Sequence, residues 1–384
     1  MRSRTWVWSA LGGSVLVGLV AFLVWSEGIP AYQRSQPVAA VSGSEPLALP
    51  ERIHNPSPNV ASTQTWGPPG PVGIVFQGRT AREGFTGEVG APWYTVSARD
   101  GGYRRLAAPH LEEADGGLWL SAQGTGIAWA WPGGIQTYDT VSGESRSYPK
   151  AAGVDPGALA WSPDQTMIAF GTDPVRVLDT GTGEVTEQPL RAPEESSARP
   201  VWTDDGRWLT IPFGDAIEGV DVETGQRRTL PVGLDGLRQA RWSQDDALAG
   251  LRPGATGQFL QVVRTHGWEG RDATASAVDA GRPRLVIEGL LGWAGADEVV
   301  LVGLQPETGS IEQAMAYSLT NQTLRPYMVV PTLGDNWAGI GTVSVAGDLL
   351  ERRTRAFPRP GEPWSSGAKL LTCMLVAVFP TVYF

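Results

Sequence analysis

Two short turn motifs recur along this chain at one period. Four tryptophans mark the first motif at spacings of 41, 40 and 51 residues: Trp161, Trp202, Trp242 and Trp293. Three aspartates open the second motif, Asp-x-x-x-Gly, at spacings of 40 and 42 residues: Asp139, Asp179 and Asp221. Two different turns in a fixed phase indicate a repeated unit, and a period of ~40–45 residues is typical of propeller blades.

One repeat predicts four short strands. Between residues 157 and 190, apolar stretches end at Trp161 and Phe170, a partly alternating stretch ends at Asp179, and a more polar stretch follows Gly183. Four antiparallel strands ordered from the inner to the outer edge make one propeller blade. The predicted fold class is therefore all-β, a β-propeller of four-stranded antiparallel blades preceded by one transmembrane α-helix.

Six such units can be recognised between residues 93 and 328. Residues 337–350 contain a further strand-like stretch, Gly341 to Ala346. This stretch either supplies the missing inner strand of the first unit, which closes the ring, or begins a seventh blade. We favour six blades.

The best-preserved repeat resembles a known group of proteins. Trp161-Ser-Pro-Asp164 precedes the strand Ile168-Ala-Phe170, and Asp179-Thr-Gly-Thr-Gly183-Glu184 follows. This order of motifs is similar to that of TolB-like and WD40-like bacterial propellers over residues 72–330. The resemblance implies a propeller that acts mainly as an interaction platform.

The amino-terminal region predicts a membrane anchor. Residues 6–25, from Trp6 to Trp25, carry no charge, and a helix of that length spans the ~30 Å hydrocarbon core. Arg2 and Arg4 precede the apolar run, so the positive-inside bias places residues 1–5 in the cytoplasm and the propeller outside, in a bacterial cell membrane. A cleaved signal peptide is the alternative, but its apolar region is usually ~7–15 residues long.

The remaining boundaries follow from composition. Residues 26–71 are rich in Pro, Ser and Ala and are expected to form an extracytoplasmic linker, whereas residues 72–352 form the propeller. Residues 353–369 form a second, Pro-rich linker. Residues 370–384 are apolar but too short for a full helical span, so they are either a partial membrane segment or a buried tail.

Charge and cysteine content limit the partners. The formal net charge is −10, which disfavours binding to nucleic-acid backbones. The single cysteine, Cys373, lies in the apolar tail, so the propeller is expected to hold no internal disulfide. The membrane, through residues 6–25, and a protein or other envelope component are the expected partners.

We find no sequence motif for catalysis, for a cofactor or for a metal. The three histidines lie far apart in sequence, and the repeated aspartates fall once per blade, where they are expected to bond the backbone of their own turn. Trp161, Trp202 and Trp242 are expected to pack between blades. Binding residues are sought where the repeat is broken. The candidates are Trp268, Glu269 and Arg271 in an enlarged outer hairpin, together with Trp129 and Trp131.

These observations predict a membrane-anchored, extracytoplasmic propeller that is not an enzyme and binds an envelope protein or a cell-wall component. The alternative is an extracytoplasmic propeller enzyme that acts on glycans or with a quinone, with carboxylates gathered on one face. A structural accessory to a secretion or signalling system is a third possibility.

Overall fold

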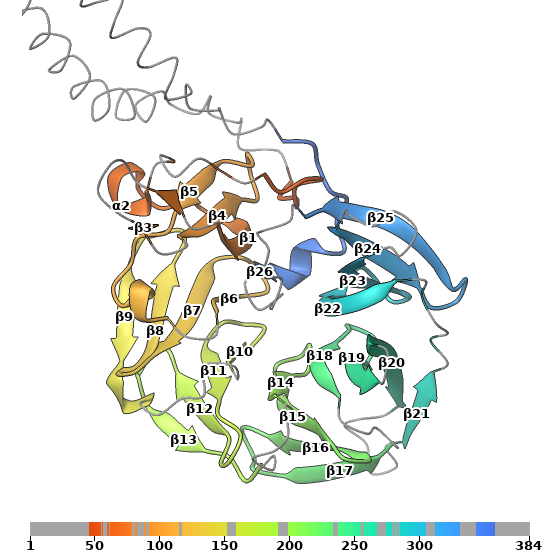
Figure 1. The fold of residues 1–384 in the computed structure, drawn as a ribbon. Helices are drawn as coiled ribbons and strands as arrows, with labels where there is room; N and C mark the ends of the chain where they lie inside the picture. The colour runs from red at the N-terminus through yellow and green to blue at the C-terminus, as the bar shows by residue number, and fades with distance from the viewer. Residues whose placement is uncertain are drawn as a thin grey trace, which may run out of the picture.

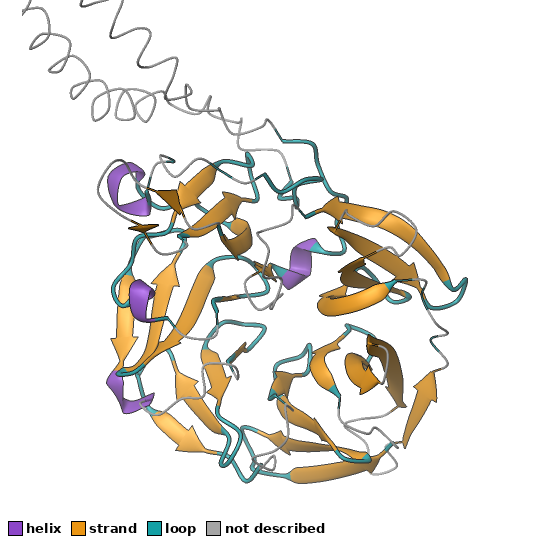
Figure 2. Cartoon of the chain, viewed as in Figure 1, coloured by secondary structure: helices purple, strands orange, loops and turns teal. Residues whose placement is uncertain are grey.

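The computed structural model describes residues 46–357 with internal gaps. The gaps are 55, 57–59, 61, 79–80, 83–87, 90–91, 115–116, 152–158, 191–198, 233–236, 255–256, 267–273, 279, 281–282, 284, 305–311 and 331–342. Helices are short in this part of the chain: α2 (Thr63–Trp66) and the 3-10 turns η1 (Leu111–Glu113), η2 (Pro149–Ala151) and η4 (Gly347–Leu349). Nearly all other regular structure is strand (Figure 2).

Within the described residues, the strands form six antiparallel blades around a central axis (Figure 1). Blade 1 contains β26 (Val343–Val345), β1 (Val72–Gln77), β4 (Trp93–Ser97) and β5 (Tyr103–Arg105). Blade 2 contains β6 (Trp119–Leu120), β7 (Gly126–Trp131), β8 (Gly134–Asp139) and β9 (Ser145–Tyr148). Blade 3 contains β10 (Ala160–Trp161), β11 (Met167–Phe170), β12 (Arg176–Asp179) and β13 (Val185–Glu187).

The second half of the ring has the same plan. Blade 4 contains β14 (Val201–Trp202), β15 (Trp208–Phe213), β16 (Ala216–Asp221) and β17 (Arg227–Pro231). Blade 5 contains β18 (Arg238–Trp242), β19 (Ala247–Gly254), β20 (Gly257–His266) and β21 (Thr274–Val278). Blade 6 contains β22 (Val286–Trp293), β23 (Glu298–Leu304), β24 (Glu312–Ser318) and β25 (Thr323–Val329). A small hairpin, β2 (Ala81–Arg82) with β3 (Glu88–Val89), lies between β1 and β4.

The ring is closed by the two ends of the domain. The late strand β26 pairs antiparallel with the early strand β1, with Ile74 opposite Val345 and Phe76 opposite Val343. Val343–Val345, within the stretch Gly341 to Ala346, therefore forms the inner strand of blade 1, which is the first of the two alternatives given above, and six blades are confirmed for the described residues. Because both ends share one sheet, blade 1 is complete only when β26 has joined β1.

The hydrophobic core lies in layers between blades. One layer joins Ile135 of blade 2 with Ile168 and Phe170 of blade 3, and each is at most 1% exposed. A similar layer joins Leu209 and Val220 of blade 4 with residues of blade 3. Each sheet is therefore covered on both faces, which explains why the second strand of a blade is almost wholly apolar.

Four tryptophans join blades 3, 4, 5 and 6 each to the blade before it. Three indole Nε1–H groups donate to a carbonyl of the preceding inner strand: Trp161 to Trp119 (3.0 Å), Trp202 to Ala160 (3.0 Å) and Trp293 to Arg241 (3.0 Å). A half-buried or buried indole usually needs such a partner. The expected packing of Trp161 and Trp202 between blades is confirmed, and Trp293 bonds in the same way.

Trp242 reaches the equivalent carbonyl through a hydroxyl group. Its indole donates to the Thr210 hydroxyl at 2.9 Å, and that hydroxyl donates to the Val201 carbonyl at 2.8 Å. Val201 directly precedes Trp202, as Ala160 precedes Trp161. The same backbone position therefore receives the neighbouring tryptophan in each of these blades.

The repeated aspartates hold the turn between the third and fourth strands of a blade. The carboxylate of Asp179 accepts from the backbone N–H groups of Gly181 and Thr182, both at 2.8 Å. Gly183 ends the turn with a φ of 73°, a conformation that glycine adopts without strain. The side-chain-to-backbone bonds expected from the sequence are confirmed.

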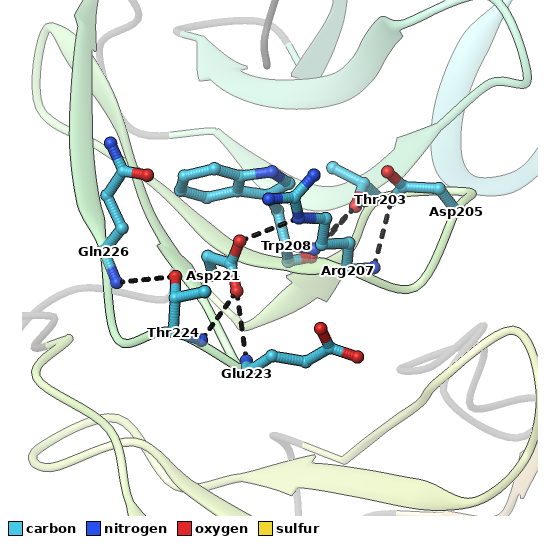
Figure 3. Close-up of polar contacts among 8 residues, drawn as sticks. All are labelled: Thr203, Asp205, Arg207, Trp208, Asp221, Glu223, Thr224 and Gln226. Atoms are coloured by element: carbon cyan, nitrogen blue, oxygen red, sulfur yellow. Dashed lines mark hydrogen bonds and ion pairs between the residues drawn. The ribbon is translucent and has the colours of Figure 1, made fainter.

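Asp221 has an additional partner (Figure 3). Its carboxylate is fully buried, accepts from Glu223 N at 3.1 Å and Thr224 N at 2.9 Å, and pairs with Arg207 Nε at 2.7 Å. Burial alone raises the pKa of this carboxyl, but the hydrogen bonds from Thr224, Arg207 and Glu223 outweigh that effect and lower it below its usual value.

The segments that enter and leave the propeller pair with each other. Glu51 N donates to Arg355 O at 3.0 Å and Arg355 N donates to Leu49 O at 2.8 Å, while Ile53 N donates to Val329 O of β25 at 2.9 Å. Leu49 and Ile53 are buried. Parts of the predicted linkers 26–71 and 353–369 are thus packed on the propeller, because their apolar residues complete its core.

The predicted membrane segments, residues 6–25 and 370–384, lie outside the described residues. Within the described part, no helix is both long and apolar enough to cross a membrane. The anchor and the domain boundaries therefore remain predictions.

We expect Asp221→Asn to lower the free energy of unfolding by about 2–3 kcal/mol at neutral pH, because a buried charge-assisted pair is lost. Since the pKa of Asp221 is lowered in the folded state, its stabilisation is present above the unfolded pKa of about 4 and is lost as the pH falls through the lower, folded value. Denaturant unfolding at several pH values measures both effects.

Asp179→Asn is the matched control. Asp179 accepts the same two kinds of backbone bond but has no arginine partner, so its loss is expected to be about 1 kcal/mol or less. Equal losses in the two variants would contradict the role assigned to Arg207.

Candidate functional site: the central channel

A channel of about 290 Å³ runs along the axis of the propeller. Inner-strand residues of all six blades line it, including the tryptophans Trp161, Trp202, Trp242 and Trp293. Figure 1 shows the six inner strands β26, β6, β10, β14, β18 and β22 facing the axis. Because a propeller brings one equivalent position from each blade to the axis, this is where residues far apart in sequence can act together.

The ends of the inner strands form an acidic mouth, which we define as Asp204, Asp348 and Glu351. Asp204 lies in the turn after β14, whereas Asp348 and Glu351 follow β26. Burial raises the pKa of Asp204, and the charges of Asp348, Asp205 and Asp246 raise it further. Asp348 follows the inner strand of blade 1, so its repulsion with Asp204 of blade 4 exists only in the closed ring.

The other two carboxyls respond in the same way. Burial raises the pKa of Asp348, although the positive charge of Arg352 opposes the increase. Burial also raises the pKa of Glu351, and the charges of Asp204 and Asp348 add to that effect. All three side chains are nevertheless reached by solvent. We therefore treat the mouth as a region of negative potential rather than as a buried cluster.

Arginine residues lie on the other side of the tryptophans. Arg199 precedes β14 and Arg241 lies within β18, and both line the channel. Burial lowers the pKa of Arg241 to about 10, and the positive charge of Arg199 contributes to the decrease. Solvent in the channel reaches the side chain, which stays protonated at neutral pH. The carboxylates of the channel thus follow the inner strands, whereas Arg199 precedes one inner strand and Arg241 lies within another.

The tryptophans singled out from the sequence have different positions. Trp129 is fully buried in the core shared by blades 1, 2 and 6, and it donates to His110 O at 3.3 Å. Its side chain therefore cannot touch a partner. We correct the expectation for this residue: adjacent positions on a strand point to opposite faces, and Trp129 points into the packed layer.

Trp131 lies at the end of β7 and is partly exposed. The His110 ring stacks on it with 3.7 Å between centroids and an interplanar angle of 7°, and His110 Nδ1 lies 3.1 Å from Glu113 Oε1. The indole is therefore already covered on one face by this chain's own side chain. The other candidates, Trp268, Glu269 and Arg271, lie outside the described residues, in the connection between β20 and β21.

The structure brings together residues that the sequence did not single out: Asp204, Asp348, Glu351, Arg199 and Arg241. The repeat contains a signal for Asp204, because Asp204 directly follows Thr203, the hydroxyl residue that caps the turn after β14. The Thr203 hydroxyl accepts from Trp208 N at 3.0 Å, as the Ser162 hydroxyl accepts from Met167 N at 2.9 Å. The residue after this hydroxyl lines the channel in blades 2 to 5, as Ala122, Pro163, Asp204 and Gln244. Among the described residues, no group of three or more His, Cys, Asp or Glu side chains is placed to hold a metal ion.

Comparison with solved structures gives propellers. TolB from Acinetobacter baumannii is 14% identical with a TM-score of 0.46, and the match covers 70% of this chain and 68% of that one. The β-propeller domain of Cps50 (Swd1) from Myceliophteria thermophila is 11% identical with a TM-score of 0.46 over 63% of this chain and 80% of that one. The chain is a β-propeller similar to TolB and WD40 domains.

A third similar structure is an enzyme. Dipeptidyl peptidase 4 from Porphyromonas gingivalis is 10% identical with a TM-score of 0.40, covering 70% of this chain and 46% of that one. No protein-family pattern and no curated protein sequence matches the chain. At these identities the likeness concerns the fold alone. The fold itself is established by the six blades, of which blades 5 and 6 are joined into one eight-stranded sheet where Gln258 pairs with Ile287.

We expect Asp204→Asn to raise the melting temperature slightly at pH 7. The corresponding gain in the free energy of unfolding should be no more than about 1 kcal/mol, since solvent screens the carboxylate. The pKa of Asp204 is raised in the folded state, so its ionisation opposes folding above the raised value. The gain should disappear at about pH 3, where the carboxyl is protonated in both states. Thermal unfolding across this pH range provides the measurement.

Glu223→Gln is the control, because Glu223 is an exposed carboxyl in the outer turn after β16. It should leave the melting temperature unchanged at both pH values. A loss of stability in Asp204→Asn at pH 7 would show that this carboxylate has a favourable partner rather than unfavourable neighbours.

Proposed function

We propose that this protein is a non-catalytic binding module that captures a protein of the cell envelope at its central channel. The channel carries the proposal, because six blades converge on it and both carboxylates and arginines line it. Charged side chains of this kind steer and orient a partner rather than perform a reaction. Propellers of similar fold include TolB and a WD40 domain.

We further propose that residues 6–25 anchor the chain in the membrane, with the propeller on the extracytoplasmic side. The uncharged run, its flanking tryptophans and the preceding Arg2 and Arg4 support this orientation. A tether raises the effective concentration of the propeller toward other envelope proteins, so that a modest affinity suffices.

Site-specific photo-crosslinking in intact cells tests the binding site. A photoreactive residue in place of Gln244, which is exposed and lines the channel mouth, should give a discrete adduct with a protein. The same residue in place of Gln226, exposed in the outer turn before β17, should give none. Mass spectrometry then identifies the adduct.

Two results would change the proposal. An adduct that forms only from position 268 would move the site to the enlarged hairpin of blade 5. Capture of glycan instead of protein at Gln244 would make a cell-wall component the ligand. The absence of an adduct at both position 244 and position 268 would overturn binding at these surfaces.

Protease protection tests the orientation. With a tag at the amino terminus, protease added to spheroplasts should degrade the propeller and leave the tag intact until the membrane is permeabilised. A tag that is cleaved in intact spheroplasts would show that the amino terminus lies outside.

A further inference from the structure

Two arginine side chains from neighbouring blades share one region of the channel. Arg199 stands before the inner strand of blade 4, and Arg241 lies within that of blade 5. Both are accessible from the channel, and their positive charges are close enough to repel each other. Folding thus holds two cations together at a position where water and solutes can enter.

Arg241 has no carboxylate partner among the described residues. The only side-chain hydrogen bond of its guanidinium there goes to Ala240 O, at 2.9 Å. Other arginines of the propeller are paired with carboxylates: Arg176 with Glu187, Arg207 with Asp221, Arg227 with Glu218 and Arg325 with Glu298. In a chain with 40 acidic and 30 basic side chains, an unpaired arginine at the axis is a distinct feature.

The backbone of Arg241 is fixed by the tryptophan bonds. Its carbonyl accepts the Trp293 indole N–H at 3.0 Å, and the next residue, Trp242, bonds Thr210 at 2.9 Å. The backbone that carries the guanidinium is therefore held between two strands, and the guanidinium itself donates to Ala240 O.

The channel wall favours an anion beside the arginines. Apolar side chains such as Leu290 and Leu291 line the wall and strengthen electrostatic attraction. Arg199 precedes the inner strand β14 and Asp204 follows it, so this strand separates the two charges along the chain.

We propose that Arg199 and Arg241 form an oxyanion-binding site that holds a carboxylate or phosphate group of the ligand inside the channel. A guanidinium presents parallel N–H donors that match the two oxygens of such a group, and two guanidinium groups can share one oxyanion. This inference rests on the channel as the site of the proposed function and adds the chemistry of the bound group.

Thermal unfolding of the full-length chain in detergent tests the site. Inorganic phosphate should raise the melting temperature in a saturable manner compared with chloride at equal ionic strength, since a ligand that binds only the folded state stabilises it. Arg241→Gln and Arg199→Gln should each weaken the apparent phosphate affinity about ten-fold or more, as expected for a lost charged hydrogen bond.

Arg146→Gln is the matched control, because Arg146 is an exposed arginine on the outer strand β9. It should leave the phosphate response unchanged. Arg241→Lys keeps the positive charge but lacks the forked N–H donors, so its phosphate affinity should be intermediate. This variant tests the site if Arg241→Gln does not fold.

Two peptide probes separate the sources of the anion. A short alanine peptide with a free carboxyl terminus and its amidated form differ only in the carboxylate. Stabilisation by the free peptide but not by the amidated peptide assigns the site to a peptide carboxyl terminus. Stabilisation by phosphate alone assigns the site to a phosphate group. Identical responses of wild type and both Gln variants to all probes would overturn the inference. Photo-crosslinking from Gln244 that persists in Arg241→Gln would then leave the binding function standing without the anion site.

Discussion

The hydrogen bond from an indole N–H to the inner strand of the preceding blade is the interaction on which the architecture depends. A blade has two apolar faces and cannot bury both alone. The tryptophan fills the gap between two blades with its ring and fixes their spacing with its polar edge, at 3.0 Å for Trp161, Trp202 and Trp293. Hydrophobic packing holds neighbouring blades together, and the indole hydrogen bond fixes their register relative to each other.

The same registration shapes the channel. Each acceptor carbonyl belongs to the residue directly before the tryptophan position of its own strand, so the bonds hold the inner strands of blades 2 to 6 in one register. Asp204 lies two positions after Trp202, Arg241 lies one position before Trp242, and both line the channel.

The sequence predicted the fold well because the same turn and strand motifs recur in several blades. The turn at Asp179 and the strand ending at Phe170 follow from local chemistry alone, and both occur as expected. The site was less accessible from the sequence. Asp204, Asp348 and Arg241 lie on three blades, and only ring closure through β26 brings them to one channel. Trp129 shows the opposite case, because its departure from the repeat serves packing.

The pairing of the entering and leaving segments has a mechanical consequence. Residues 50 and 355 pair in parallel, so the chain arrives at one end of this short ribbon and departs from the other. Tension applied between the two ends of the domain loads the bonds of Glu51 and Arg355 together, in shear, rather than opening them one after another. A propeller held by both ends in this way resists being pulled open at the strand that closes its ring.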